Sequence, residues 1–177
     1  MFLLRTALWE VGNRSLTADR TKLVQAIDSH FEGMLNGVDT VGGYRLPPGG
    51  VDDRVVLENV RRITRTLNAA GCRASWLIVE DGEVVGLCGY RRPPKDGEVE
   101  IGYSVAPNRR NRGIATRAVA AIVAAARLDP QIHKITAETA ENNRASGAVL
   151  KKNGFVEAGR ANDPDEGPAV YWVLEIK

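Results

Sequence analysis

Cysteine and histidine are scarce in this chain, whose 177 residues include only two of each. No two of them have the close spacing of metal ligands, so we expect no metal cofactor. Cys72 and Cys88 predict free, buried thiols in a reducing compartment. No apolar run approaches the roughly 18 residues of a membrane-spanning helix, and the short apolar opening is not typical of a signal peptide. We therefore expect a cytoplasmic protein that does not bind membranes.

A strong charge of one sign is also missing, because 24 Lys and Arg face 22 Asp and Glu for a net charge of +2. This balance argues against a dedicated nucleic-acid-binding protein, although Arg109, Arg110 and Arg112 form a local basic cluster. The 44% of hydrophobic and 26% of charged residues are ordinary for a folded chain. The length fits a single domain over residues 1–177 that buries its core without disulfides or metals.

The first fifty residues give the weakest structural signals. Residues 2–9 have the composition of a strand. Apolar residues at helical spacing, preceded by Thr and Asp as caps, predict a helix over about residues 17–35. Residues 42–50 are rich in Gly and Pro and predict a loop. A second helix is expected over residues 52–71, with carboxylates at its start and Gly71 at its end.

The pattern changes to strands after residue 72. Residues 76–80 and 83–90 form two apolar runs around Asp81-Gly82, a strong hairpin signal. A third strand is expected over residues 98–106, where glutamates alternate with apolar residues. Together they predict an antiparallel meander.

The remainder alternates helices and strands. An alanine-rich helix over residues 113–128 and a strand over residues 133–140 predict a right-handed crossover that makes this strand parallel to the third one. A short helix then runs to Lys152, capped by Asn142 or Asn143 and ended by Asn153-Gly154. Two final strands are expected over residues 155–159 and 169–176, joined by a polar loop at 162–168. The predicted fold class is α/β, with a mixed, mostly antiparallel central sheet flanked by helices.

The segment from residue 105 to 115 carries the clearest chemical signal. It joins a strand end to a helix start, where free N–H groups and the helix dipole favour an anion. Gly113 allows a ligand to approach the backbone, and the three arginines add positive charge. It is neither a nucleoside-triphosphate loop nor a dinucleotide-binding fingerprint. Taken alone, an ordinary turn with surface arginines explains it equally well.

Arg110-Asn111-Arg112-Gly113-Ile114-Ala115 resembles the segment of the GCN5-related N-acetyltransferase (GNAT) superfamily that cradles the pyrophosphate of acetyl-coenzyme A. The preceding Glu100-Ile101-Gly102-Tyr103 and the later stretch from Asn143 to Phe155 also look like this superfamily. Their order and spacing are most similar to the ribosomal-protein N-terminal acetyltransferase branch. The resemblance covers roughly residues 75–177 and implies the superfamily's splayed central strands.

The resemblance implies that acetyl-CoA is the cosubstrate and that pantetheine lies between the two splayed strands. Backbone groups near Val105 would pair with pantetheine, and an N–H there would polarise the thioester carbonyl. Asn143 would hold a pantetheine amide. The implied cofactor-binding residues are Val105, Arg110, Asn111, Arg112, Gly113, Ile114, Ala115, Asn143 and Ser146.

The resemblance also implies direct attack of an amine on the thioester, without an acyl-enzyme. The general base stays open between Glu138, Glu100 and neither of them, because each carboxylate has an ordinary ion-paired or solvated role as an alternative. Ser146 matches a serine that a sister branch places against the coenzyme sulfur. The tyrosine acid of the alanine-N-terminus branch is absent, since its position is Leu150.

The acceptor is expected to be a primary amine, either a protein N-terminus or a small molecule. A homodimer is an expectation at the level of the family only. Two other classes of function stay open: a non-catalytic acyl-CoA-binding or regulatory domain of the same fold, and a nucleic-acid-binding module. Tyr103 and Trp172 are interpreted as core aromatics rather than substrate-binding residues, and His133 as a turn residue.

Overall fold

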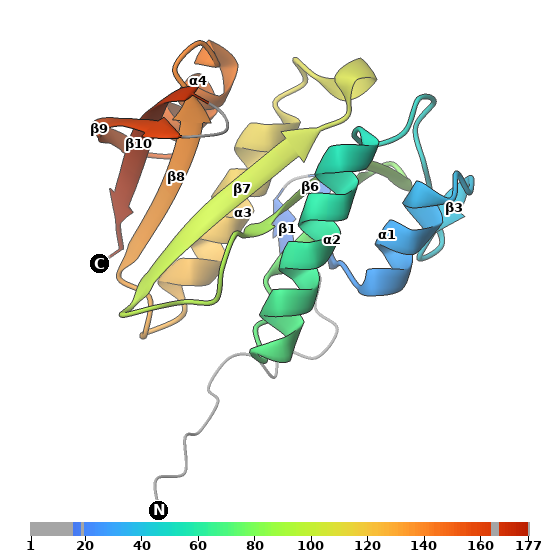
Figure 1. Cartoon of the computed structure of the whole chain (residues 1–177), viewed down its shortest axis with the longest axis horizontal. Coiled ribbons are helices and arrows are strands. Elements are labelled where there is room, and N and C mark those ends of the chain that lie inside the picture. Colours follow the sequence, from blue (N-terminus) through green and yellow to red (C-terminus); the bar gives the residue numbers. More distant parts are fainter. Residues whose placement is uncertain (1–15, 19, 164–166, 177) are drawn as a thin grey trace, which may run out of the picture.

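The computed structural model describes residues 16–18, 20–163 and 167–176 (Figure 1). The strand expected at residues 2–9 lies outside the described residues. The strands are β1 (Leu16–Ala18), β2 (Thr21–Gln25), β3 (Thr40–Val41), β4 (Tyr44–Arg45), β5 (Ser75–Glu80), β6 (Glu83–Tyr90), β7 (Glu98–Val105), β8 (Lys134–Ala140), β9 (Val156–Asp163) and β10 (Gly167–Glu175). The helices are α1 (Asp28–Leu35), α2 (Arg54–Ala69), the 3₁₀ turn η1 (Pro107–Arg109), α3 (Ile114–Arg127) and α4 (Arg144–Lys152).

A single twisted sheet organises these elements in the order β1-β2-β5-β6-β7-β8-β10-β9. The meander β5-β6-β7 is antiparallel, and β8 is parallel to β7, as the crossover through α3 requires. The short hairpin β3-β4 joins the first residue of β6 through one parallel pair, Arg45 with Glu83. The predicted α/β class, with a mostly antiparallel sheet and flanking helices, is therefore confirmed.

Helices cover both faces of the sheet. Helices α1 and α2 lie in front of it in Figure 1, and α3 lies behind. The alanine-rich side of α3 packs into the larger of two buried apolar clusters, while Phe31 and Met34 of α1 belong to the smaller one. Cys72 and Cys88 are free and buried, as predicted. Within the described ranges, no helix is long and apolar enough to cross a membrane.

The predicted helix over residues 17–35 is wrong in its first half. Thr21–Gln25 is a strand that pairs with β5, and the helix begins only at Asp28. Leu23 and Phe31 are both fully buried, but they lie on different elements. Their spacing fits a helical period and also an alternating strand followed by a turn, and pairing with β5 decides between the two.

The predicted boundaries of the later elements agree with the structure, with one difference. Strands β9 and β10 extend further toward each other than expected, because Gly167 pairs with Asp163 and Pro168 with Asn162. Most of the polar segment predicted as a loop at 162–168 therefore belongs to strands. Trp172 is 3% exposed and packs in the larger core cluster, as predicted for a core aromatic.

Candidate coenzyme and acetyl-transfer site

Strands β7 and β8 pair over only three positions before they separate. The parallel register runs from Glu98 with Lys134 to Glu100 with Thr136, and residues 101–105 of β7 have no partner on β8. Figure 1 shows the two arrows diverging beyond this point. This divergence is the splay that the family resemblance predicted.

The free half of β7 has backbone hydrogen-bonding groups that do not pair with β8. Arg91 N donates to Glu100 O at 2.8 Å, and Ala106 N donates to Val85 O at 3.0 Å, so these even-numbered residues of β7 face β6. Backbone groups alternate between the two edges of a strand, which directs those of Tyr103 and Val105 toward the divergence, where Val105 O accepts from Arg110 Nε. Such N–H and C=O groups require partners, and an extended amide-bearing chain can supply them.

The turn after β7 is built from two residues with left-handed backbone. Asn111 has φ 62° and Gly113 has φ 73°, and Gly113 precedes the first turn of α3. A Cβ atom at Gly113 would lie 2.9 Å from Arg117 Nη1, so both the backbone and the space favour glycine. The start of α3 therefore offers an uncovered backbone whose N–H groups suit an anion.

The three arginines of this turn have different roles. Arg109 forms a two-pronged ion pair with Glu83, with nitrogen–oxygen distances of 2.6 and 3.0 Å. Arg110 is exposed and donates from Nε to Val105 O at 3.1 Å. Arg112 is also exposed, and neither of these two pairs with a carboxylate in the part of the chain that the structure describes. Arg109 thus fixes the turn, while Arg110 and Arg112 keep guanidinium donors for a ligand.

The two candidate bases differ in their surroundings. Glu100 is 7% exposed, and its carboxylate is held by Arg92 and by Arg91 at 3.2 Å. Glu138 is exposed, stands opposite Tyr171 in the register of β8 and β10, and has no ion pair within the described residues. Of the two carboxylates, that of Glu138 is therefore the one without an ion-pair partner among the described residues.

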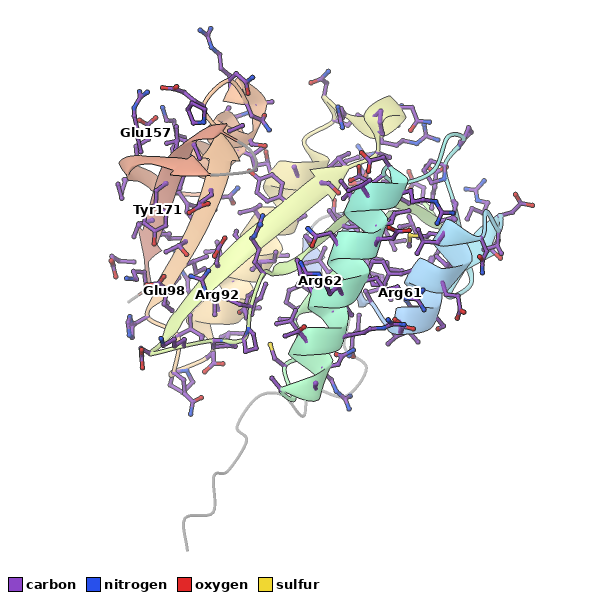
Figure 2. The ribbon with its side chains drawn as sticks, viewed as in Figure 1. Arg61, Arg62, Arg92, Glu98, Glu157 and Tyr171 are labelled. Atoms are coloured by element: carbon purple, nitrogen blue, oxygen red, sulfur yellow. The ribbon has the colours of Figure 1, made fainter. Side chains whose placement is uncertain are left out.

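Both carboxylates lie on the same face of the sheet. Glu100 and Thr136 are register partners, and Glu138 follows Thr136 by two positions on β8. Figure 2 shows the labelled Arg92, Glu98 and Tyr171 on the side of the sheet that α2 occupies. Glu138 lies on the diverging part of β8, whereas Glu100 occupies the last position of β7 that pairs with β8.

The first turn of α4 closes the other side of the divergence. Asn143 caps the helix by accepting from Ser146 N at 3.1 Å. Tyr103 Oη donates to Ser146 O at 3.0 Å and so ties β7 to α4. Burial raises the pKa of Tyr103 to about 12, which keeps the phenol protonated as the donor of this bond. Leu150 is fully buried in the core, so its side chain does not line the site.

Two features of the site were missed by sequence reasoning. Ser104 Oγ is, among the described residues, the one buried side-chain polar atom without a hydrogen-bond partner. Tyr103 is a bridge between strand and helix as well as a core aromatic. The alternation of β7 could have placed Ser104 on the face of Glu100, but only the structure shows that its hydroxyl has no partner.

The comparisons with known proteins agree with this geometry. The model of an acetyltransferase (GNAT) domain matches residues 20–156, so the chain belongs to the GNAT acetyltransferase family. This confirms the resemblance drawn from the sequence. An uncharacterized N-acetyltransferase, p20 of Bacillus licheniformis, is 27% identical over 99 residues. That match covers 55% of this chain and only 56% of the relative.

Solved structures with the same fold include members of the predicted branch. The ribosomal-protein α-N-acetyltransferase RimL in complex with coenzyme A has a TM-score of 0.69 at 15% identity, over 92% of this chain and 98% of that chain. Mycobacterium smegmatis RimJ in complex with a CoA disulfide has a TM-score of 0.65 at 22% identity, over 88% and 81%. The microcin self-immunity acetyltransferase MccE, in complex with acetyl-CoA and AMP, has a TM-score of 0.68 at 16% identity, over 92% and 99%.

Proposed function

We propose that this protein is an N-acetyltransferase that transfers the acetyl group of acetyl-CoA to a primary amine by direct attack. The observation that carries the proposal is the divergence of β7 and β8 beside the uncovered start of α3. The backbone edge of β7 that does not pair with β8 suits the amides of pantetheine, and the turn with Arg110 and Arg112 suits the pyrophosphate. The residues present therefore fit the coenzyme.

The transfer forms one bond and breaks another. The amine nitrogen attacks the thioester carbonyl carbon, the carbon–sulfur bond breaks, and the sulfur leaves as the thiolate of CoA. The amine gives up one proton, and a neutral amine is needed for attack. An α-amine near pKa 7.8 costs only about 1 kcal/mol to deprotonate at pH 7, whereas a lysine near 10.4 costs about 4.6 kcal/mol.

Glu138 is the base that we assign for this proton, either directly or through a water. Its carboxylate is exposed, while that of Glu100 is held by two arginines. Glu100 instead holds Arg91 and Arg92, which directly follow β6, through its two ion pairs. A positioned carboxylate contributes typically about 10²–10⁴-fold to such a step.

Ser146 is the residue that we assign to the leaving sulfur. Its backbone is fixed at both ends, since its N–H is capped by Asn143 and its carbonyl accepts from Tyr103. These two bonds fix the Ser146 backbone, from which the hydroxyl extends, at the edge of the divergence. A hydroxyl there can donate a hydrogen bond to a thiolate, whose parent thiol has a pKa near 8.5 by analogy with cysteine.

A non-catalytic acyl-CoA-binding domain is the second candidate. One observation favours it: Leu150 is core where a related branch has its tyrosine acid. Turnover decides between the two, measured as release of free thiol from acetyl-CoA with a panel of peptides, polyamines and aminoglycosides. Coenzyme binding without release of thiol on any amine would favour this second candidate.

The first experiment is a thermal-shift titration with acetyl-CoA, with ATP and NAD as controls. At about 100 times Kd, a ligand that binds only the folded state adds about 2.7 kcal/mol, which for a chain of this size raises the Tm by about 5–11 °C. A rise with acetyl-CoA alone supports the proposal. No rise at millimolar acetyl-CoA would contradict it.

A further inference from the structure

Arg117, in the second turn of α3, connects three segments that are distant in sequence. Its Nε donates to Thr21 Oγ1 at 2.7 Å, and its Nη2 donates to Glu80 Oε1 at 2.7 Å. Its Nη1 donates to Arg112 O at 3.1 Å. The guanidinium therefore links the β2 and β5 strands to the turn that begins α3.

The strand side of this network is rigid. Thr21 is fully buried, and the side chains of Glu80 and Arg117 are 11% and 25% exposed. Burial raises the pKa of Glu80, but hydrogen bonds from Thr21 and Arg117 outweigh it and leave the pKa below its usual range. Glu80 thus stays ionised and holds the guanidinium in one place, as a planar fork between fixed acceptors.

The contact with Arg112 O sets the direction of a peptide group. In a trans peptide the carbonyl of one residue and the N–H of the next point to opposite sides. Because Arg117 holds the Arg112 carbonyl toward α3, the Gly113 N–H is directed away from the body of the helix. Gly113 has a left-handed φ of 73° and no side chain of its own to restrict the backbone. The contact from Arg117 is therefore what restrains this peptide group.

We propose that Arg117 is a positioning residue for the diphosphate of the coenzyme: it does not touch the ligand but fixes the Arg112–Gly113 peptide so that its N–H meets the phosphate oxygens. This inference rests on the proposed function, since it concerns the same coenzyme site. It assigns a binding role to an ion pair that would otherwise only join α3 to the sheet. If Arg117 had only a structural role, its substitution would change the affinity for every ligand and the stability together. Substitution of a positioning residue changes the affinity only for ligands that carry a diphosphate.

The test compares Arg117→Lys with Arg127→Lys, a matched control in the exposed last turn of the same helix. Lysine can keep the ion pair with Glu80, but its single nitrogen cannot replace a fork that contacts three acceptors. Calorimetry measures the Kd of CoA, and an NMR titration measures that of pantetheine, which carries no phosphate. Thermal unfolding of each free protein records stability.

For Arg117→Lys we expect the Kd of CoA to rise by roughly ten-fold, the usual effect of one lost charge-assisted hydrogen bond. The Kd of pantetheine should stay unchanged, as should both values for Arg127→Lys. An unchanged Kd of CoA, or an equal rise for CoA and pantetheine, would overturn the inference. If the unmodified protein does not bind CoA at all, it is the proposed function that fails.

Discussion

Glu138 and Glu100 are both candidates for the general base, and their different surroundings predict different effects of substitution. The Glu138→Gln variant should lower kcat by about 10²-fold or more, because the amide cannot accept the amine proton. Steady-state thiol release with an active acceptor measures it. Glu157→Gln is the matched control, since Glu157 is an exposed strand glutamate whose one ion-pair partner among the described residues is Lys151. An unaltered kcat and pH–rate profile in Glu138→Gln would rule out this base.

Glu100→Gln should behave differently from Glu138→Gln. The substitution weakens the ion pairs to Arg91 and Arg92, so we expect a loss of about 1 kcal/mol in the free energy of unfolding. The value of kcat should change far less than in Glu138→Gln. Denaturant unfolding and kcat, measured on the same preparations, check both parts.

Substitution of Ser104 should not lower the stability, in contrast to substitution of Glu100. The buried hydroxyl of Ser104 has no hydrogen-bond partner in the part of the chain that the structure describes, so Ser104→Ala removes an unsatisfied polar group and should leave the Tm unchanged or higher. Thermal unfolding without ligand checks this. A clear fall in Tm would mean that the hydroxyl is satisfied by an ordered water in solution.

At the scale of residues, the sequence predicted on which elements the candidate site residues lie, but not which side chains they contact. Gly113, Asn143 and the arginines could be placed because their local spacing follows a strand end and two helix starts. The partners could not be predicted, because Glu83 meets Arg109 and Glu80 meets Arg117 across 26 and 37 positions. Contacts at such separations depend on the register of the sheet.

At the scale of elements, Gly113→Val should act on the turn between β7 and α3. A valine there meets both a positive φ, which strains the backbone of the turn, and Arg117 Nη1 at 2.9 Å from its Cβ, so the turn or the Arg117 side chain must shift. We expect the Kd of CoA to rise by at least about ten-fold. Gly159→Val is the matched control, because Gly159 lies in β9 with an ordinary φ, and a Cβ added there would have no atom within 4 Å. Equal affinity of the two variants for CoA would contradict the placement of the site.

The elements that sequence reasoning placed well carry their own end signals. Asp53 caps α2 by accepting from Val56 N at 2.9 Å, and Asp81-Gly82 turns between β5 and β6. The start of α1 has no such signal, since its N-cap is Ile27, which has no side-chain acceptor. This explains why the helix was expected to begin about ten residues early, at Thr17, which has the side chain of a cap but lies in β1.

At the scale of the whole molecule, ion pairs join the layers on both faces of the sheet. Arg61 and Arg65 of α2 (Arg61 is labelled in Figure 2) both hold Asp28 at the start of α1. Glu80 holds α3 against the sheet, and Glu83 holds the turn after β7. Protonation of any of these carboxylates would weaken an ion pair that holds a helix or turn against its neighbour.

Acid should therefore destabilise the fold in a defined window. Hydrogen bonds from Arg61 and Arg65 hold the pKa of Asp28 well below its usual range, and a bond from Arg109 lowers that of Glu83. A carboxyl with a lowered pKa in the folded state contributes stability that is fully present above its unfolded pKa of about 4 and is lost as the pH falls below it. Between about pH 5 and pH 3 the Tm should fall, and Asp28→Asn should fall less steeply than the unmodified protein. Thermal unfolding at fixed ionic strength measures both slopes, and parallel slopes would show that Asp28 does not link α1 to α2 in solution.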